Sequence, residues 1–112
     1  MKILESMLDS EVILELQKSG FRKHSFDDRI ILTKTHKVYG EIEIRATYNN
    51  AKKEFYITLY AEKLPKSGIR MDVKEGSLQF SEDSDKRIHG PPSTKDPKIA
   101  DGYILKLGSY FI

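Results

Sequence analysis

The stretch EIEIRATYNNAKKEFYITLYA, residues 41–61, decides the fold. In its first part polar residues at odd positions alternate with the apolar set Ile42, Ile44, Ala46 and Tyr48. In its second part the apolar set is Phe55, Ile57, Leu59 and Ala61. Strict alternation is typical of a half-buried strand, because successive side chains of a strand point to opposite faces. The stretch therefore predicts two strands, each with one buried and one polar face.

The pairing of these two strands follows from their apolar positions. Both apolar sets lie on one face only if paired residue numbers sum to an odd value, and a four-residue turn at 50–53 gives 103. That register pairs Ile44 with Leu59 and Ala46 with Ile57. On the polar face it places these pairs opposite each other: Thr47 and Tyr56, Arg45 and Thr58, Glu43 and Tyr60.

The N-terminal twenty residues carry an apolar stripe at helical spacing, formed by Leu4, Leu8, Val12 and Leu16 with Ile3, Met7 and Ile13 beside them. Gly20 is expected to end the helix. A second helix starting at Asp9 or Ser10 fits as well as one bent helix. In either case the stripe is expected to cover a sheet.

Four further strands are predicted, at residues 30–35, 69–73, 78–80 and 103–107. A fifth, short strand at 21–26 is an additional option. The last of the four is inferred from Tyr103, Leu105 and Leu107 alternating with Lys106. The sequence thus predicts a single α+β domain over residues 1–112. In it the N-terminal helix packs on one face of a mostly antiparallel sheet of five to seven strands.

Residues 81–102, SEDSDKRIHGPPSTKDPKIADG, predict a long loop before the last strand. Pro91, Pro92 and Pro97 cannot donate a hydrogen bond to a sheet. Connections of this length are usually functional or disordered. The segment begins acidic and continues basic, so it reads either as an arm that binds a partner or as a surface insertion.

Composition limits the function classes. Nineteen basic and seventeen acidic residues give a net charge of +2, which is too even to indicate nucleic-acid binding by itself. The absence of cysteine excludes disulfides, thiolate zinc sites and thiol nucleophiles, and favours a cytoplasmic location. The N-terminus lacks the uninterrupted apolar run of a signal peptide or membrane span.

No recognised catalytic or metal-binding motif is present. The three histidines, His24, His36 and His89, have no spacing that brings them together, and surface positions are the simplest interpretation. The acidic runs at 25–28 and 81–85 lack the glycine turn and the final glutamate of a calcium loop. We therefore expect no enzyme activity, no metal and no cofactor.

The stretch LELQKSGFRKHSF, residues 14–26, resembles the start of HicA-type messenger-RNA-cleaving toxins, small α+β proteins with a catalytic histidine on an early strand. It covers about a tenth of the chain. The family's Gly-Ser-His signature is absent, since no glycine precedes His24 and Ser25 and Phe26 follow it. The resemblance implies a small ribonuclease with His24 as its catalytic residue, as one alternative function.

The preferred interpretation is a small non-enzymatic regulator, such as an inhibitor or adaptor of the kind that phages and mobile elements encode. It would bind a protein partner through the polar sheet face and the 81–102 loop. The candidate binding residues are Arg45, Tyr56, Thr58, Tyr60, Lys86, Arg87, His89, Lys95 and Lys98. Tyrosine and arginine are enriched at protein interfaces, whereas Glu41 and Glu43 would repel phosphates. The alternative interpretation of the polar face is an ordinary cross-strand cluster, or a face covered by residues 109–112.

A second alternative is nucleic-acid binding by basic loops. These loops contain Lys52, Lys53, Lys63, Lys66, Lys86, Arg87, Lys95 and Lys98. Such binding must weaken steeply with salt, because phosphate contacts release counterions.

Overall fold

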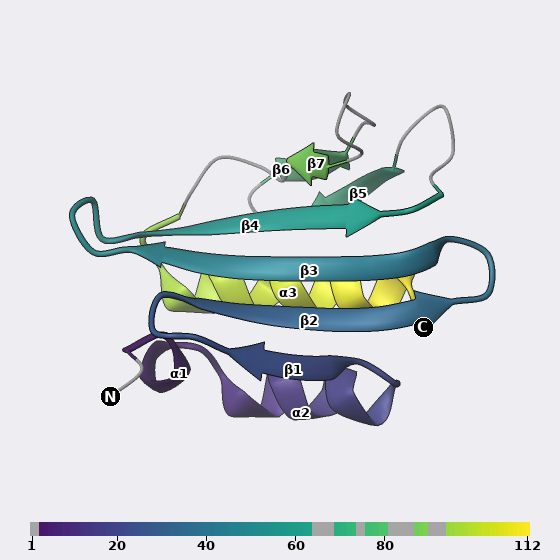
Figure 1. Ribbon diagram of the computed structural model, residues 1–112. Helices are drawn as coiled ribbons and strands as arrows, with labels where there is room; N and C mark the ends of the chain where they lie inside the picture. The colour runs from purple at the N-terminus through teal and green to yellow at the C-terminus, as the bar shows by residue number, and fades with distance from the viewer. Residues whose placement is uncertain (1–2, 64–68, 74–75, 81–86, 90–93) are drawn as a thin grey trace.

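The computed structural model describes residues 3–63, 69–73, 76–80, 87–89 and 94–112. Figure 1 shows an antiparallel sheet with helices on one side of it, so the predicted α+β class is confirmed. The elements follow in the order α1 (Ile3–Met7), α2 (Ser10–Lys18), β1 (Arg22–Ser25), β2 (Arg29–His36), β3 (Gly40–Asn49), β4 (Glu54–Ala61), β5 (Ile69–Val73), β6 (Gly76–Phe80), β7 (Arg87–His89) and α3 (Pro97–Tyr110).

The main sheet has the strand order β1-β2-β3-β4-β7, and every pair in it is antiparallel. Its continuous part is the meander of four consecutive strands β1 to β4, and the three-residue β7 adds to the edge of β4. Strands β5 and β6 form a separate two-stranded sheet. The prediction of one sheet with five to seven strands is therefore too large for the continuous meander, which has four strands. Residues 69–73 do not extend it.

The predicted register of the central hairpin is confirmed. Ile44 lies opposite Leu59 and Ala46 opposite Ile57. The face that carries these four residues, which we call the inner face, is sealed: Ile44 and Leu59 are each 1% exposed. The opposite face, which we call the outer face, carries half-buried side chains such as Thr58.

The C-terminal segment is a helix, so the strand predicted at 103–107 is wrong. Asp96 caps α3 by accepting a hydrogen bond from the backbone N–H of Lys98, and Pro97 occupies the first turn, where its missing N–H costs nothing. Buried residues recur along α3 at helical spacing, namely Ala100, Tyr103, Ile104 and Leu107. These side chains pack onto β3 and β4.

The predicted 81–102 loop is correspondingly too long. Residues 87–89 form β7, Thr94 makes an isolated bridge with Phe55, and α3 begins at Pro97. The backbone N–H of Phe55 donates to the carbonyl of Thr94 at 2.7 Å, and that of Thr94 donates back at 3.1 Å. Thr94, just before α3, thus lies at the edge of β4.

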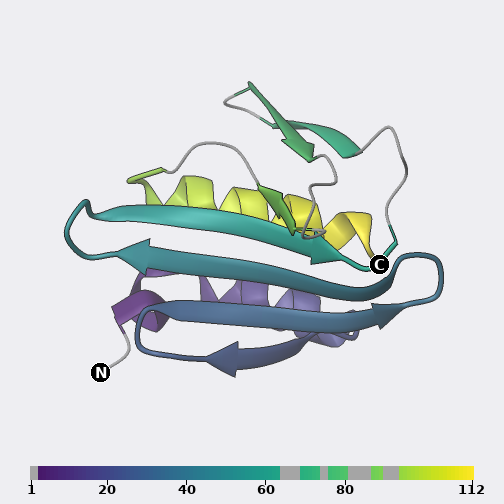
Figure 2. The same ribbon diagram turned by 45° about the horizontal axis from the view of Figure 1, so that its top comes forward.

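The N-terminal segment forms two short helices, which decides between the two readings of the sequence. Asp9 caps α2 by accepting from the backbone N–H of Glu11, and Gly20, with φ of 104°, follows its C-terminal end. The buried residues here are Leu4, Leu8, Ile13 and Leu16, so Ile13 takes the place expected for Val12. The N-terminal helices contact β1 and β2, whereas α3 covers the centre of the sheet (Figure 2). The sheet's main cover is therefore not the predicted N-terminal helix.

Helices α2 and α3 run side by side in the same direction and are joined at both ends. At their N-terminal ends the backbone N–H of Asp9 donates to both carboxylate oxygens of Asp101, at 2.9 and 3.0 Å. At their C-terminal ends Lys34 Nζ donates to the carbonyls of Ser19 and Phe111, each at 2.8 Å. A cation there also complements the negative ends of both helix dipoles. In the described part of the chain no helix has the length and apolar character to cross a membrane.

Candidate functional site

The outer face is built by alternate residues of the four meander strands. Register places most of them in three rows that cross three or four strands of the sheet. The rows are Arg22–Thr33–Glu43–Tyr60, His24–Ile31–Arg45–Thr58 and Arg29–Thr47–Tyr56. The predicted pairs of β3 and β4 are confirmed within these rows. Because the described helices pack on the inner face, none of them lies over these rows (Figure 2).

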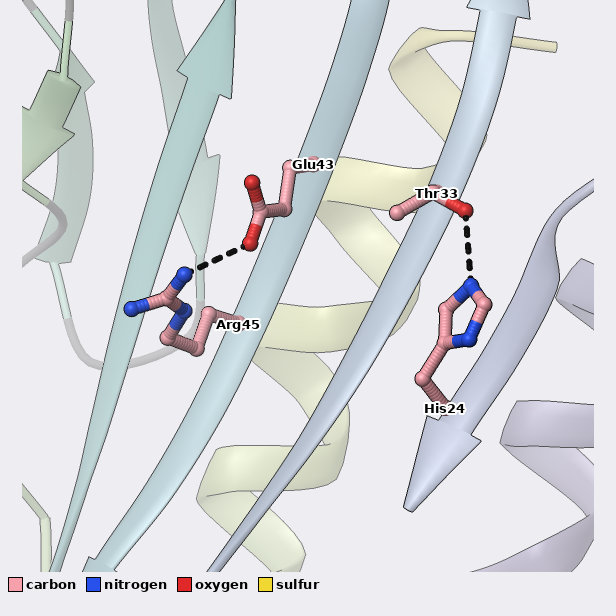
Figure 3. A network of polar contacts seen from close by, with 4 residues as sticks. All are labelled: His24, Thr33, Glu43 and Arg45. Atoms are coloured by element: carbon pink, nitrogen blue, oxygen red, sulfur yellow. Dashed lines mark hydrogen bonds and ion pairs between the residues drawn. The ribbon is translucent and has the colours of Figure 1, made fainter. Parts of the chain in front are cut away.

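Polar contacts within the face hold its side chains in place. Arg45 Nη2 donates to Glu43 Oε1 at 2.7 Å, and the two side chains are 32% and 30% exposed. His24 Nε2 lies 3.3 Å from Thr33 Oγ1. Figure 3 shows these four side chains on the side of the strands away from α3. The half-exposed ion pair adds at most about 1 kcal/mol to stability, so its main effect is to orient Arg45.

A shallow hollow lies over β3 and β4. It is lined by Glu43, Arg45, Thr47, Tyr56, Thr58 and Tyr60. Tyr56 and Tyr60 line its two ends. Their Cα atoms are about 14 Å apart along β4, because each residue of a strand rises about 3.4 Å. The Tyr56 hydroxyl donates to Glu54 Oε2 at 2.9 Å, which orients that ring. Between the rings lie Arg45 and Thr58.

Charge on the outer face is balanced. Its positions on β1 to β4 include three arginines and three glutamates, namely Arg22, Arg29, Arg45, Glu41, Glu43 and Glu54. A nucleic-acid footprint requires clustered positive charge. A face with equal numbers of positive and negative side chains is instead suited to bind a surface that also carries both charges, as protein surfaces do.

The predicted binding residues are only partly brought together. Arg45, Tyr56, Thr58 and Tyr60 share the outer face. The backbone of β7 borders them, since Arg87 is paired with Tyr60 and His89 with Thr58.

The remaining predicted residues lie elsewhere. Lys95 and Lys98 are exposed at the start of α3, in the helical layer, and so do not join the outer face. Lys86 and Lys66 lie outside the described residues. The predicted arm is therefore divided between a sheet edge and a helix start.

The C-terminal residues do not cover the outer face. Phe111 is fully buried in the core, where its ring contacts Tyr39 at 5.4 Å between centroids. Tyr110 packs on the same Tyr39 ring, and the two hydroxyls are 3.2 Å apart. Covering of the tyrosine-bearing face by residues 109–112 is thus excluded.

The histidines do not form a pair. In the row that contains Arg45, His24 and His89 occupy opposite ends, and four inter-strand steps separate their backbones by about 19 Å. His36 ends β2, where its Nδ1 accepts from the backbone N–H of Val38 at 3.0 Å. Across the described residues, no cluster of three histidine, aspartate or glutamate side chains could hold a metal ion.

Sequence reasoning missed the half of the outer face that β1 and β2 supply. Its members are Arg22, His24, Arg29, Ile31, Thr33 and Thr35. A usable signal was present, because Ile30 and Leu32 alternate with polar or half-buried neighbours in the same way as Ile42 and Ile44. Pairing Ile30 with Ala46 then extends the outer face to β2, and pairing His24 with Ile31 extends it to β1.

The predicted basic loops do not form one patch. Lys52 and Lys53 lie at the turn before β4 and Lys63 lies beyond its other end, roughly 30 Å away. Lys95 lies near Lys52 and Lys53, because the neighbouring residue Thr94 forms a bridge with Phe55. The same end of the molecule also carries acids, at Asp27, Asp28, Glu54 and Asp96. Positive charge is therefore not concentrated there.

Comparisons with protein-family models, curated proteins and solved structures found no match to this chain. The resemblance of residues 14–26 to HicA-type toxins gains no support from them. The function is argued from the site alone.

Proposed function

We propose that the protein is a non-enzymatic binding module that regulates a protein partner by docking it on the outer face. The observation that carries this proposal is a whole sheet face left open by the described helices, with two tyrosines and an arginine around one shallow hollow. Tyrosine and arginine are the residues that most often dominate binding energy at protein interfaces. Docking there would let the protein act on its partner as an inhibitor or as an adaptor.

The dimensions of the face suit one side of a small interface. Four strands about 4.8 Å apart span roughly 14 Å between the outer two backbones, and the eight residues of β4 run roughly 27 Å. The projected area is about 400 Å², and β7 at the edge enlarges it toward the roughly 800 Å² per partner of a standard interface. Rough side-chain surfaces bury more area than their projection.

Preorganisation supports the same proposal. Tyr56 and Arg45 are already oriented by Glu54 and Glu43, so docking would order few side chains. Each flexible side chain that must be immobilised costs about 0.5–1.5 kcal/mol of affinity. Tyrosine adds large contact area with only two rotatable bonds, which keeps that cost small.

The experiment is a comparative capture from lysate of the native host. The bait is the full chain as wild type, as the Tyr56→Ala/Tyr60→Ala variant, and as Tyr110→Ala, a matched tyrosine change away from the outer face. We expect the wild type and Tyr110→Ala to retain the same protein with or without nuclease, and the double variant to lose it. Equal retention by the double variant, or loss of capture after nuclease treatment, would contradict the proposal.

A further inference from the structure

The helical layer presents a second, different surface. On its solvent side a groove lies along α2 and is bordered on the α3 side by Leu105. The two helices are held in contact where Leu16 packs against Gly108. The groove is lined by Asp9, Glu11, Val12, Leu14, Glu15, Lys18 and Leu105. Two of these are large apolar side chains left in solvent, since Leu14 is 52% and Leu105 is 39% exposed.

The space above α3 is open beside these leucines. Gly102 lies one turn before Leu105, and a side chain there would find no atom within 4 Å. Leu14 also borders a second hollow on the other flank of α2, shared with Leu8 and Ile13. Leu14 is therefore accessible from both flanks of α2, whereas Leu8 and Ile13 belong to the core.

The rim of the groove is acidic. Glu11 and Glu15 stand one turn apart on α2, and neither forms an ion pair with any residue in the described part of the chain. Lys18 is the one base that lines the groove. The groove thus combines leucine and valine side chains with the carboxylates of Glu11 and Glu15, which form no ion pair in the described residues. It favours a ligand with an apolar side and with positive charges beside that side.

We propose that this groove binds a basic amphipathic helix of a protein partner, which gives the molecule a second docking surface on the side opposite the outer face. Helix-in-groove recognition uses apolar anchors at helical spacing, here placed over Leu14 and Leu105. Lysine or arginine side chains beside the anchors pair with Glu11 and Glu15. Charge complementarity favours this occupant over a second copy of the chain, which would set the same carboxylates against one another, and over nucleic acid, which they repel.

The test uses a synthetic peptide of about 14 residues, roughly four helical turns, with leucine along one face and lysine elsewhere. Two control peptides carry glutamate in place of lysine, or the same residues in scrambled order. Binding is followed by NMR titration of the full chain. We expect the lysine–leucine peptide to shift the amide resonances of Leu14, Glu15 and Leu105. Both control peptides should bind at least about tenfold more weakly, a difference of about 1.4 kcal/mol or more in binding free energy.

Protein variants separate the two contributions. Leu14→Ser with Leu105→Ser should weaken binding about tenfold while the unfolding midpoint stays close to wild type, because both side chains are exposed. Glu11→Lys with Glu15→Lys should transfer the preference to the glutamate–leucine peptide. Tyr56→Ala, on the outer face, should change nothing. Equal binding of the scrambled peptide, or unchanged affinity in the leucine variant, would overturn the proposal.

Discussion

The two faces of the four-stranded meander differ in what holds their side chains. Leu59 on the inner face is 1% exposed and is fixed by the core that α3 closes. Thr58, the preceding residue, is half-buried on the outer face, where neighbouring side chains of the sheet hold it in place. A single step along β4 thus passes from a position that determines stability to one that is available for recognition. Substitutions on the outer face should therefore change binding without unfolding the protein.

The largest expected effect comes from opening a cavity on the inner face. Leu59→Ala should lower the free energy of unfolding by about 2–5 kcal/mol, because the sealed core closes only partly around the lost atoms. Thr58→Ala, one residue away, should lower it by less than about 1 kcal/mol. Urea unfolding of both variants measures the difference. Similar losses in the two variants would show that the faces are not distinct.

The next effect concerns the ends of the helical cover. Lys34→Met keeps the apolar stem but removes the cation that binds the carbonyls of Ser19 and Phe111. We expect a loss of about 1.5–3 kcal/mol, the range for hydrogen bonds to charged groups. Lys37→Met, in the exposed turn nearby, is the matched control and should change stability by less than about 0.5 kcal/mol. An unaffected Lys34→Met protein would mean that the helix ends are held by other contacts.

Alanine substitutions at two glycines of α3 should have opposite effects on stability, because the glycines lie on different sides of the helix. At Gly108 a Cβ would lie 2.2 Å from Cδ2 of the buried Leu16, so Gly108→Ala should destabilise by about 1–3 kcal/mol through overpacking. At Gly102 the space is empty, so Gly102→Ala should stabilise by about 0.5–1 kcal/mol through helix propensity. Thermal unfolding of the pair checks both signs. Stabilisation by both alanines would contradict the close approach of α2 and α3.

The smallest effect is a pH dependence. Burial raises the pKa of Asp101, and the hydrogen bond from the Asp9 backbone only partly offsets this. The folded state then holds a proton more tightly than the unfolded chain, so this group's contribution to stability decreases as pH rises from about 4 toward the raised pKa. Asp101→Asn keeps an oxygen acceptor but does not titrate. Wild type should gain stability relative to Asp101→Asn as pH falls through that window, and a constant difference would contradict the burial of a charged group.

The alternation of β3 and β4 was enough to predict their register, because moving the pairing by one residue would turn Ile44 and Leu59 to solvent. The same reasoning failed for α3. Residues 103–107 alternate by chance, while the stronger helical signals were the cap at Asp96, Pro97 after it, and buried residues spaced three and four apart.

Other features could not be read from the chain. Lys34 occupies an inner-face position of β2, yet its partners are carbonyls 15 and 77 residues away in sequence. Their proximity depends on how α2 and α3 dock, which side-chain periodicity does not specify. The candidate site was predicted in part. Its β3 and β4 half came from local alternation, the same alternation around Ile30 and Leu32 could have added β2, and β1 required the strand order.

The most direct test of the outer face as a docking surface is an equilibrium titration of the captured partner against wild type and the Tyr56→Ala/Tyr60→Ala variant, with urea unfolding of both. We expect the variant to bind at least about tenfold more weakly, a loss of about 1.4 kcal/mol or more, with little change in its free energy of unfolding. Wild-type affinity in a correctly folded variant would show that the partner docks elsewhere.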